Sequence, residues 1–120
     1  MSVLLQVSDP HFGTELPAVV EALAALSAAQ KPDVLVISGD ITQRARPWQF
    51  AAARRFFDRL GIAQTLVTPG NHDIPLVDFF ARAFRPYARH RRVFGDDLEP
   101  TLDRPDLLAI CVNTTRRWRH

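Results

Sequence analysis

The sequence contains very little cysteine. Among its 120 residues only Cys111 is a cysteine, so no disulfide can form within the chain and a zinc site built from several thiolates is excluded. Cys111 lies in the apolar run LLAICVN, where cysteine behaves as a small hydrophobic residue. We therefore expect an inert core thiol in a protein of a reducing compartment.

A basic leader and a long apolar run are both missing from the start of the chain. The opening residues, MSVLLQVSDPH, hold an apolar stretch that is too short for a signal peptide or a membrane span. This start predicts a cytoplasmic protein that does not enter the membrane.

A broad basic face is absent as well. The formal net charge is +2, and the 13 acidic residues are interleaved with the 15 basic ones through most of the chain. Basic residues cluster only over 85–92 and 116–120, which we interpret as solvated surfaces. We expect no stable nucleic-acid partner, although either cluster could attract a phosphate-bearing substrate.

Four apolar runs rich in β-branched residues predict strands. They are nearly continuous rather than alternating, as is typical of strands buried on both faces of a parallel sheet. The runs cover residues 3–7, 33–38, 64–68 and 107–112.

Apolar residues at helical spacing lie between these runs. Pro47 and Gly61 are placed to open and close the second helix, whose aromatic residues, Trp48 among them, are predicted to be core. The spacing predicts helices over 16–30, 47–60 and 76–84, and an irregular connection over 85–106. The pattern is that of a single α/β domain, a layered βαβαβ fold with a mostly parallel sheet and right-handed crossovers.

Polar side chains follow each of the first three predicted strands. The segments are SDPHFG, SGDITQ and TPGNHD, over residues 8–13, 38–43 and 68–73. Because ligands gather outside the carboxyl ends of parallel strands, the three segments predict one composite site.

The side chains of these segments suit a metal centre. Carboxylates, imidazoles and an amide, without thiols, favour borderline-hard divalent ions such as Mn²⁺, Fe²⁺ or Zn²⁺. Asp9 and His11 are two positions apart and can turn toward one ion. The two oxygens of Asp40 could bridge two ions about 3.5–4 Å apart.

The order D-x-H, G-D and G-N-H-D resembles the calcineurin-like metallophosphoesterases. SGDITQRA and the later VNTTRRW look closest to the bacterial branch that is similar to cyclic-nucleotide phosphodiesterases. The resemblance covers essentially the whole chain. It implies one half of a four-layer β-sandwich flanked by helices, with a dinuclear metal centre in the complete enzyme.

The resemblance also implies roles for individual residues. Asp9 and His11 would bind the first metal, Asp40 would bridge, and Asn71 would bind the second metal. A bridging hydroxide would be the nucleophile.

Two further residues receive catalytic roles from the same resemblance. His72 would contact the scissile phosphate or protonate the leaving group, with Asp73 orienting its imidazole. The substrate would be a small phosphoester, with a cyclic nucleotide as one candidate.

The sequence departs from the family pattern after the third polar segment. The pattern continues with an isolated histidine and a G-H-x-H motif, whereas only His90 and His120 remain here. We expect His90 on the surface of a helix and His120 at a fraying end. Residues 1–120 thus resemble the amino-terminal part of a single metallophosphoesterase domain, with a half-built metal site and an open sheet face through which two copies could dimerise.

Three functions remain open from the sequence. The first is a metal-dependent phosphoesterase, and the second is a non-catalytic phosphate- or nucleotide-binding module with an incomplete metal site. The third is a doubly wound regulatory domain with an acidic Mg²⁺ pocket, which does not explain His11 or His72. A metal count per chain separates the first two.

Overall fold

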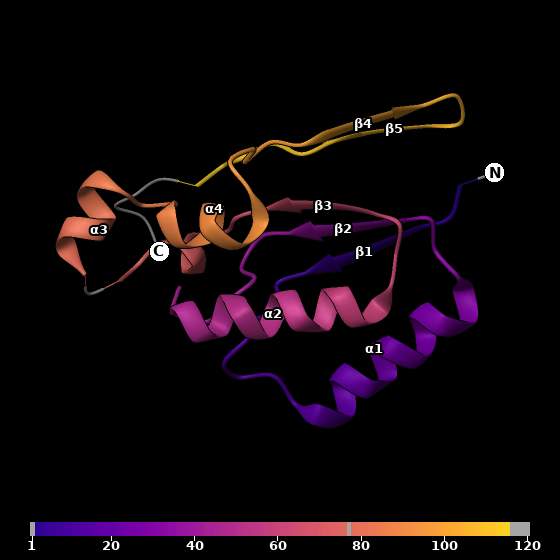
Figure 1. Ribbon diagram of the computed structural model, residues 1–120, viewed down its shortest axis with the longest axis horizontal. Helices are drawn as coiled ribbons and strands as arrows, with labels where there is room; N and C mark the ends of the chain where they lie inside the picture. Colours follow the sequence, from indigo (N-terminus) through magenta and orange to yellow (C-terminus); the bar gives the residue numbers. More distant parts are fainter. Residues whose placement is uncertain (1, 77, 116–120) are drawn as a thin grey trace.

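Three parallel strands form the centre of the molecule (Figure 1). The structure is a computed structural model that describes residues 2–76 and 78–115. The strands are β1 (Leu4–Ser8), β2 (Val34–Ser38) and β3 (Gln64–Thr68), in the order β1-β2-β3. Their last residues, Ser8, Ser38 and Thr68, lie in register, so all three carboxyl ends reach the same edge.

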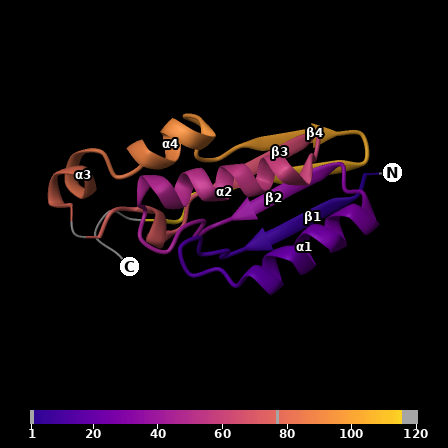
Figure 2. The ribbon, with the colours of Figure 1, turned by 60° about the horizontal axis from the view of Figure 1, so that its bottom comes forward.

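Two long helices cover one face of this sheet (Figure 2). They are α1 (Pro17–Gln30) and α2 (Pro47–Leu60), each with proline in its first turn and a left-handed residue at its end, Lys31 and Gly61 respectively. The β1-α1-β2-α2-β3 order of the sequence prediction is confirmed. No helix among the described residues is both long and apolar enough to cross a membrane.

The core lies between the sheet and α2. Leu35 and Ile37 of β2 pack with Phe56 and Phe57 of α2 and with Phe12, which follows β1. Burying one side chain of this size stabilises the fold by roughly 1.5–3 kcal/mol. The loop that carries the first polar segment is therefore anchored in the core one residue after His11.

Trp48 departs from the predicted aromatic core. Phe50, Phe56 and Phe57 are buried, but Trp48 is 56% exposed. Trp48 and Phe50 are two positions apart on the helix, and side chains at this spacing do not face the same way. Helix α1 is apolar on nearly every side, so some of its apolar residues, such as Val19 and Leu26, are exposed.

The prediction of a fourth parallel strand is wrong. Residues Leu107–Ile110 form β5, which pairs antiparallel with β4 (Thr101–Arg104) in a separate two-stranded sheet. Pro105 and Asp106 connect the two strands, and proline favours such tight turns. The local apolar content indicated a strand correctly but did not indicate its partner.

About half of the segment between β3 and this hairpin is helical. It contains the short 3₁₀ helix η1 (Asn71–Asp73), α3 (Phe79–Phe84) and α4 (Ala88–Phe94). The prediction of an irregular connection over 85–106 is therefore wrong, since α4 and β4 both lie within it.

Candidate metal centre

The loops after the three strands are joined by backbone hydrogen bonds. The amide of Asp9 donates to the carbonyl of Gly39 at 3.2 Å, and that of His11 donates to the carbonyl of Asp40 at 2.9 Å. The amide of Gly39 donates in turn to the carbonyl of Thr68 at 3.0 Å. The three polar segments are thus held at one edge of the sheet.

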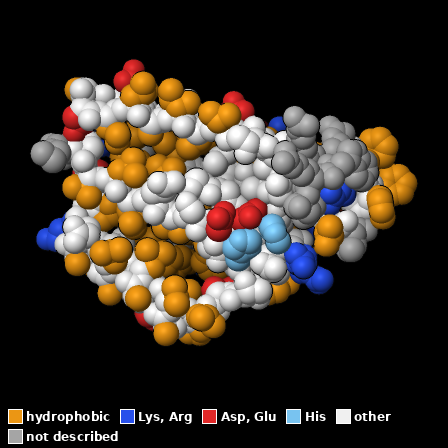
Figure 3. Space-filling view, turned by 180° about the vertical axis from the view of Figure 1, so that it is seen from behind, with side chains coloured by type: hydrophobic (Ala, Val, Ile, Leu, Met, Phe, Trp, Pro, Cys, Tyr) orange, Lys and Arg blue, Asp and Glu red, His pale blue; other side chains and the backbone are white. Residues whose placement is uncertain are grey.

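His11, Asp40 and His72 form a compact cluster at this edge. Each offers a ligand atom, and these atoms all lie within 4.8 Å of one another. Nε2 of His11 is 3.7 Å from Oδ2 of Asp40, and the two imidazole rings meet edge to face with centroids 4.9 Å apart. Figure 3 shows acidic and histidine side chains gathered side by side on one face, next to a broad apolar area.

Asp40 also belongs to a second group of polar residues. It lines a hollow of about 300 Å³ together with Asp9 and Asn71, and Thr114 and Thr115 also line this hollow. Asp40 is therefore shared by the histidine cluster and by the Asp9–Asn71 hollow, and lies where one carboxylate could serve two ions.

Two buried polar atoms at this edge have no hydrogen-bond partner among the described residues. They are Oδ1 of Asn71 and Nδ1 of His11. A buried acceptor without a donor costs free energy, and most such atoms in proteins are paired. A cation bound beside Oδ1 of Asn71 would satisfy it, and the oxygen and nitrogen donors of the whole group fit a borderline-hard divalent ion.

The backbone at three of these positions is strained. Asp9, His11 and Asp40 have φ angles of 53°, 48° and 43°, in the left-handed region that residues other than glycine rarely occupy. Such a conformation costs of order 1–3 kcal/mol and clusters at functional sites. The inter-loop hydrogen bonds hold this strain in place and fix where the three side chains project.

The backbone carbonyl of Gln43 holds the imidazole of His72. The amide of His72 donates to Oδ1 of Asp40 at 2.9 Å, and its Nδ1 lies 2.8 Å from the carbonyl oxygen of Gln43. A carbonyl only accepts, so Nδ1 carries the proton and Nε2 carries the lone pair of the neutral ring. Nη1 of Arg44 lies 3.5 Å from the same Nδ1. Since both groups are then donors, this contact is not a hydrogen bond but places a positive charge beside the ring.

Asp73 makes contacts different from those implied by the resemblance. Its buried carboxylate accepts hydrogen bonds from the amides of Ile41, Thr42 and Gly70 at 2.8–3.0 Å and from Oγ1 of Thr42 at 2.8 Å. Burial raises the pKa of Asp73, and these hydrogen bonds oppose that rise. Asp73 thus joins the loops after β2 and β3, while the Gln43 carbonyl holds the imidazole in the way expected of Asp73.

The sequence carried no direct signal for the Gln43 carbonyl or for the three amides that donate to Asp73, because these are backbone groups. The sequence prediction was wrong about His90, which lies on a helix as predicted but is fully buried. The His90 ring packs against Phe50 and Phe94.

The prediction that Cys111 is a core residue is confirmed, and burial raises the pKa of its thiol. His120 and the 116–120 cluster lie outside the described residues.

Comparisons with known proteins agree with this geometry. A family model described as calcineurin-like phosphoesterase matches residues 2–113. No curated protein gives a significant match. The family match spans both the sheet and all three polar segments, and on this evidence the chain belongs to the calcineurin-like phosphoesterase family.

Proposed function

We propose that the chain binds divalent metal ions through Asp9, His11, Asp40 and Asn71 and uses them to hydrolyse phosphodiester or phosphomonoester bonds. The family is one of metal-dependent phosphoesterases. The observation that carries the proposal is the shared position of Asp40, between the histidine cluster and the Asp9–Asn71 hollow.

The positions of Asp40 and Asn71 support particular parts in metal binding. Asp40 would bridge, since Oδ2 faces His11 and the same carboxylate lines the hollow. Asn71 would contribute its unpaired buried Oδ1. Bound ions of this kind lower the pKa of a coordinated water toward about 7 and neutralise charge on the phosphoryl group.

His72 would act on the substrate. With Nδ1 donating to the Gln43 carbonyl, the ring has a fixed orientation and Nε2 is its proton-accepting atom. Once protonated, Nε2 could donate to the leaving-group oxygen or to the scissile phosphate. A positioned acid of this kind typically contributes 10²–10⁴-fold in rate, as an order of magnitude.

One observation favours the non-catalytic alternative. Of the two histidines outside the polar segments, His90 is buried against Phe50 and Phe94 and His120 lies outside the described residues. Among the described residues, the proposed second ion has only Asp40 and Asn71 as ligands. A phosphate- or nucleotide-binding module with one weakly held ion would have this ligand set.

Metal stoichiometry and turnover measured together test the proposal. We expect the chain to bind Mn²⁺ in calorimetric titrations and to hydrolyse bis(4-nitrophenyl) phosphate above its metal-free rate. Asp40→Asn should remove metal binding and turnover with little change in thermal unfolding, because the amide oxygen of asparagine can still accept the His72 amide. Asp58→Asn, at an exposed carboxylate on α2 that pairs with Arg54, is the matched control.

The outcomes separate the two functions. Metal binding without turnover would favour the non-catalytic module. Normal Mn²⁺ affinity and rate in Asp40→Asn would rule out the bridging role.

A further inference from the structure

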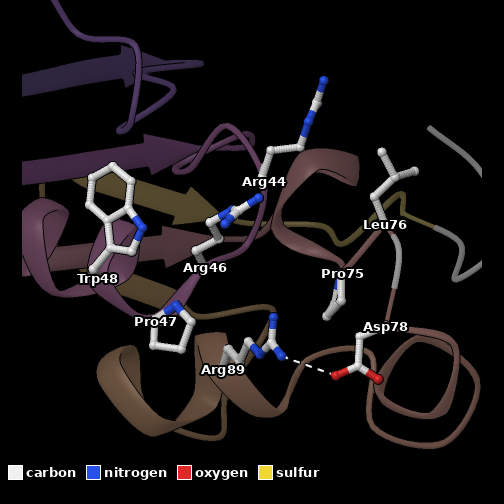
Figure 4. A pocket seen from close by; sticks show the side chains of 8 residues that line it. All are labelled: Arg44, Arg46, Pro47, Trp48, Pro75, Leu76, Asp78 and Arg89. Carbon is white, nitrogen blue, oxygen red and sulfur yellow. Dashed lines mark hydrogen bonds and ion pairs between the residues drawn. The ribbon is translucent and has the colours of Figure 1, made fainter.

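A second hollow adjoins the candidate metal centre (Figure 4). Its volume is about 430 Å³. Arg44 connects the two sites, because it lines this hollow and its Nη1 also lies 3.5 Å from Nδ1 of His72. The lining residues are Arg44, Arg46, Pro47, Trp48, Pro75, Leu76, Asp78 and Arg89. We call this hollow the arginine pocket.

The arginine pocket has an excess of positive charge. Arg89 is neutralised, since its Nη2 is 3.1 Å from Oδ2 of Asp78. Among the described residues, neither Arg44 nor Arg46 has a carboxylate partner. Two guanidinium groups without a carboxylate partner attract an anion, and their planar donor arrays match the oxygens of a phosphate.

The backbone between these two arginines is held in a strained conformation. Ala45 has a φ of 56° and is completely buried. Its amide donates to Oγ1 of Thr42 at 2.9 Å, and its carbonyl accepts from Nη1 of Arg89 at 3.2 Å. Left-handed alanine persists only where the surroundings impose it. The fold therefore fixes the directions in which Arg44 and Arg46 leave the chain.

Trp48 adds an aromatic surface to the pocket. It lies in the first turn of α2 and is 56% exposed, although tryptophan side chains are on average largely buried. In Figure 4 its indole lies beside Arg46, at the edge of the group of lining residues. An exposed indole next to guanidinium groups is the kind of surface on which a nucleic-acid base stacks.

We propose that the arginine pocket binds the part of a nucleotide substrate that is not cleaved. A second phosphate would lie against Arg44 and Arg46, and the base would stack on Trp48. The preferred substrates would then be nucleotides with a phosphate in addition to the ester beside His72. A cyclic mononucleotide, whose one phosphate is the scissile one, would leave both arginines unpaired. The assignment as a substrate site rests on the proposed function, but nucleotide binding to the pocket does not require a metal.

Fluorescence of Trp48 measures this binding directly. The chain has two tryptophans, so Trp118→Phe leaves Trp48 as the only one. In this background, with EDTA present, we expect adenosine 3′,5′-bisphosphate to change the emission. It should bind at least about tenfold more tightly than adenosine 5′-monophosphate, as one additional charge-assisted contact predicts. Inorganic phosphate, which lacks a base, should compete weakly.

Two charge reversals on the same helix region separate a specific site from general attraction. Arg46→Glu should abolish the preference for the bisphosphate. Arg55→Glu is the matched control, because Arg55 is an exposed residue of α2 that does not line the pocket, and it should retain the preference. Circular dichroism confirms that each variant is folded, and Arg46→Gln repeats the test with a milder change.

Equal affinity for the two nucleotides would overturn the proposal. Equal losses of affinity for the bisphosphate in Arg46→Glu and Arg55→Glu would overturn it as well. Since the titration is done in EDTA, a failure of the proposed hydrolysis would not affect it. Conversely, Mn²⁺-dependent turnover without a bisphosphate preference would keep the proposed function and reject the arginine pocket as a nucleotide site.

Discussion

The Asp40 carboxylate packs against Gly70 in the space that a side chain at residue 70 would need. A Cβ built on Gly70 would overlap the amide nitrogen and Oδ1 of Asp40 and lie 2.8 Å from its Cγ. The same Oδ1 accepts the amide of His72. The loop after β3 thus fixes the position of the carboxylate that the loop after β2 supplies.

Gly70→Ala should therefore weaken metal binding although it replaces none of the proposed ligands. The new methyl group would push Asp40 out of position, and we expect Mn²⁺ affinity to fall about 10–100-fold, as for loss of a group that orients a ligand. Overpacking of this kind also costs roughly 1–3 kcal/mol of stability. Calorimetric titration with Mn²⁺ measures the first effect and urea unfolding the second.

Gly61→Ala is the control for this substitution. Gly61 has a φ of 65°, and a Cβ there would meet nothing within 4 Å. It should lose about 1 kcal/mol of stability from backbone strain and keep its Mn²⁺ affinity. Wild-type affinity in Gly70→Ala would mean that Asp40 is not a metal ligand.

His72→Ala should separate an acid from a ligand. If Nε2 acts on the leaving group, the variant keeps its Mn²⁺ and loses turnover by about 10²–10⁴-fold. Because the ligand atom of His72 lies within 4.8 Å of those of His11 and Asp40, loss of metal would instead make His72 a ligand. Gln43→Ala is the control: its carbonyl, not its side chain, contacts the ring, so it should retain its rate.

Asp73→Asn should chiefly destabilise the fold. The carboxylate accepts from Ile41, Thr42 and Gly70, and an asparagine would turn its NH₂ group toward some of these donors. We expect a loss of roughly 2–3 kcal/mol in the free energy of unfolding, measured in urea. Asp96→Asn, at an exposed carboxylate, should change it little. Unchanged stability with lost turnover would restore the imidazole-orienting role implied by the resemblance.

The sequence predicted those features that have strong local signals. The strands β1 to β3 are short apolar runs, and α2 is bracketed by Pro47 and Gly61, so each element could be located before its neighbours were known. The hairpin was not predicted, because the apolar content of Leu107–Ile110 fits a sheet strand and a hairpin strand equally well. Only the Pro105–Asp106 turn distinguishes the two.

The same distinction applies to the site. The approach of His11 to Asp40 follows from strand order, since parallel neighbours end at one edge. The Gln43 carbonyl and the three amides that bind Asp73 carry no sequence signal, because every residue except proline has an amide and every residue has a carbonyl. The resemblance therefore did not predict the amides from which Asp73 accepts, although the residues that it selected lie at one edge of the sheet.

The buried His90 should make stability dependent on pH. Neither ring nitrogen has a hydrogen-bond partner among the described residues. Burial, with a smaller contribution from the charge of Arg91, lowers the pKa of His90 from 6.5 to about 4. The unfolded chain then binds this proton more readily than the folded one. The contribution of the neutral, buried His90 to the free energy of unfolding is thus fully present above pH 6.5, and it is lost progressively as the pH falls toward 4.

Removing the imidazole should remove this dependence. At pH 5, keeping the ring unprotonated in the folded chain lowers the free energy of unfolding by about 2 kcal/mol, at roughly 1.36 kcal/mol for each pH unit below 6.5. We expect the free energy of unfolding of His90→Leu, measured against wild type in EDTA, to improve by this amount between pH 7.5 and pH 5. At pH 7.5 the two proteins differ only in how the side chain packs on Phe50 and Phe94, and other titrating groups cancel in the difference. Parallel stability curves for the two proteins over this range would show that the imidazole is protonated as readily in the folded chain as in the unfolded one.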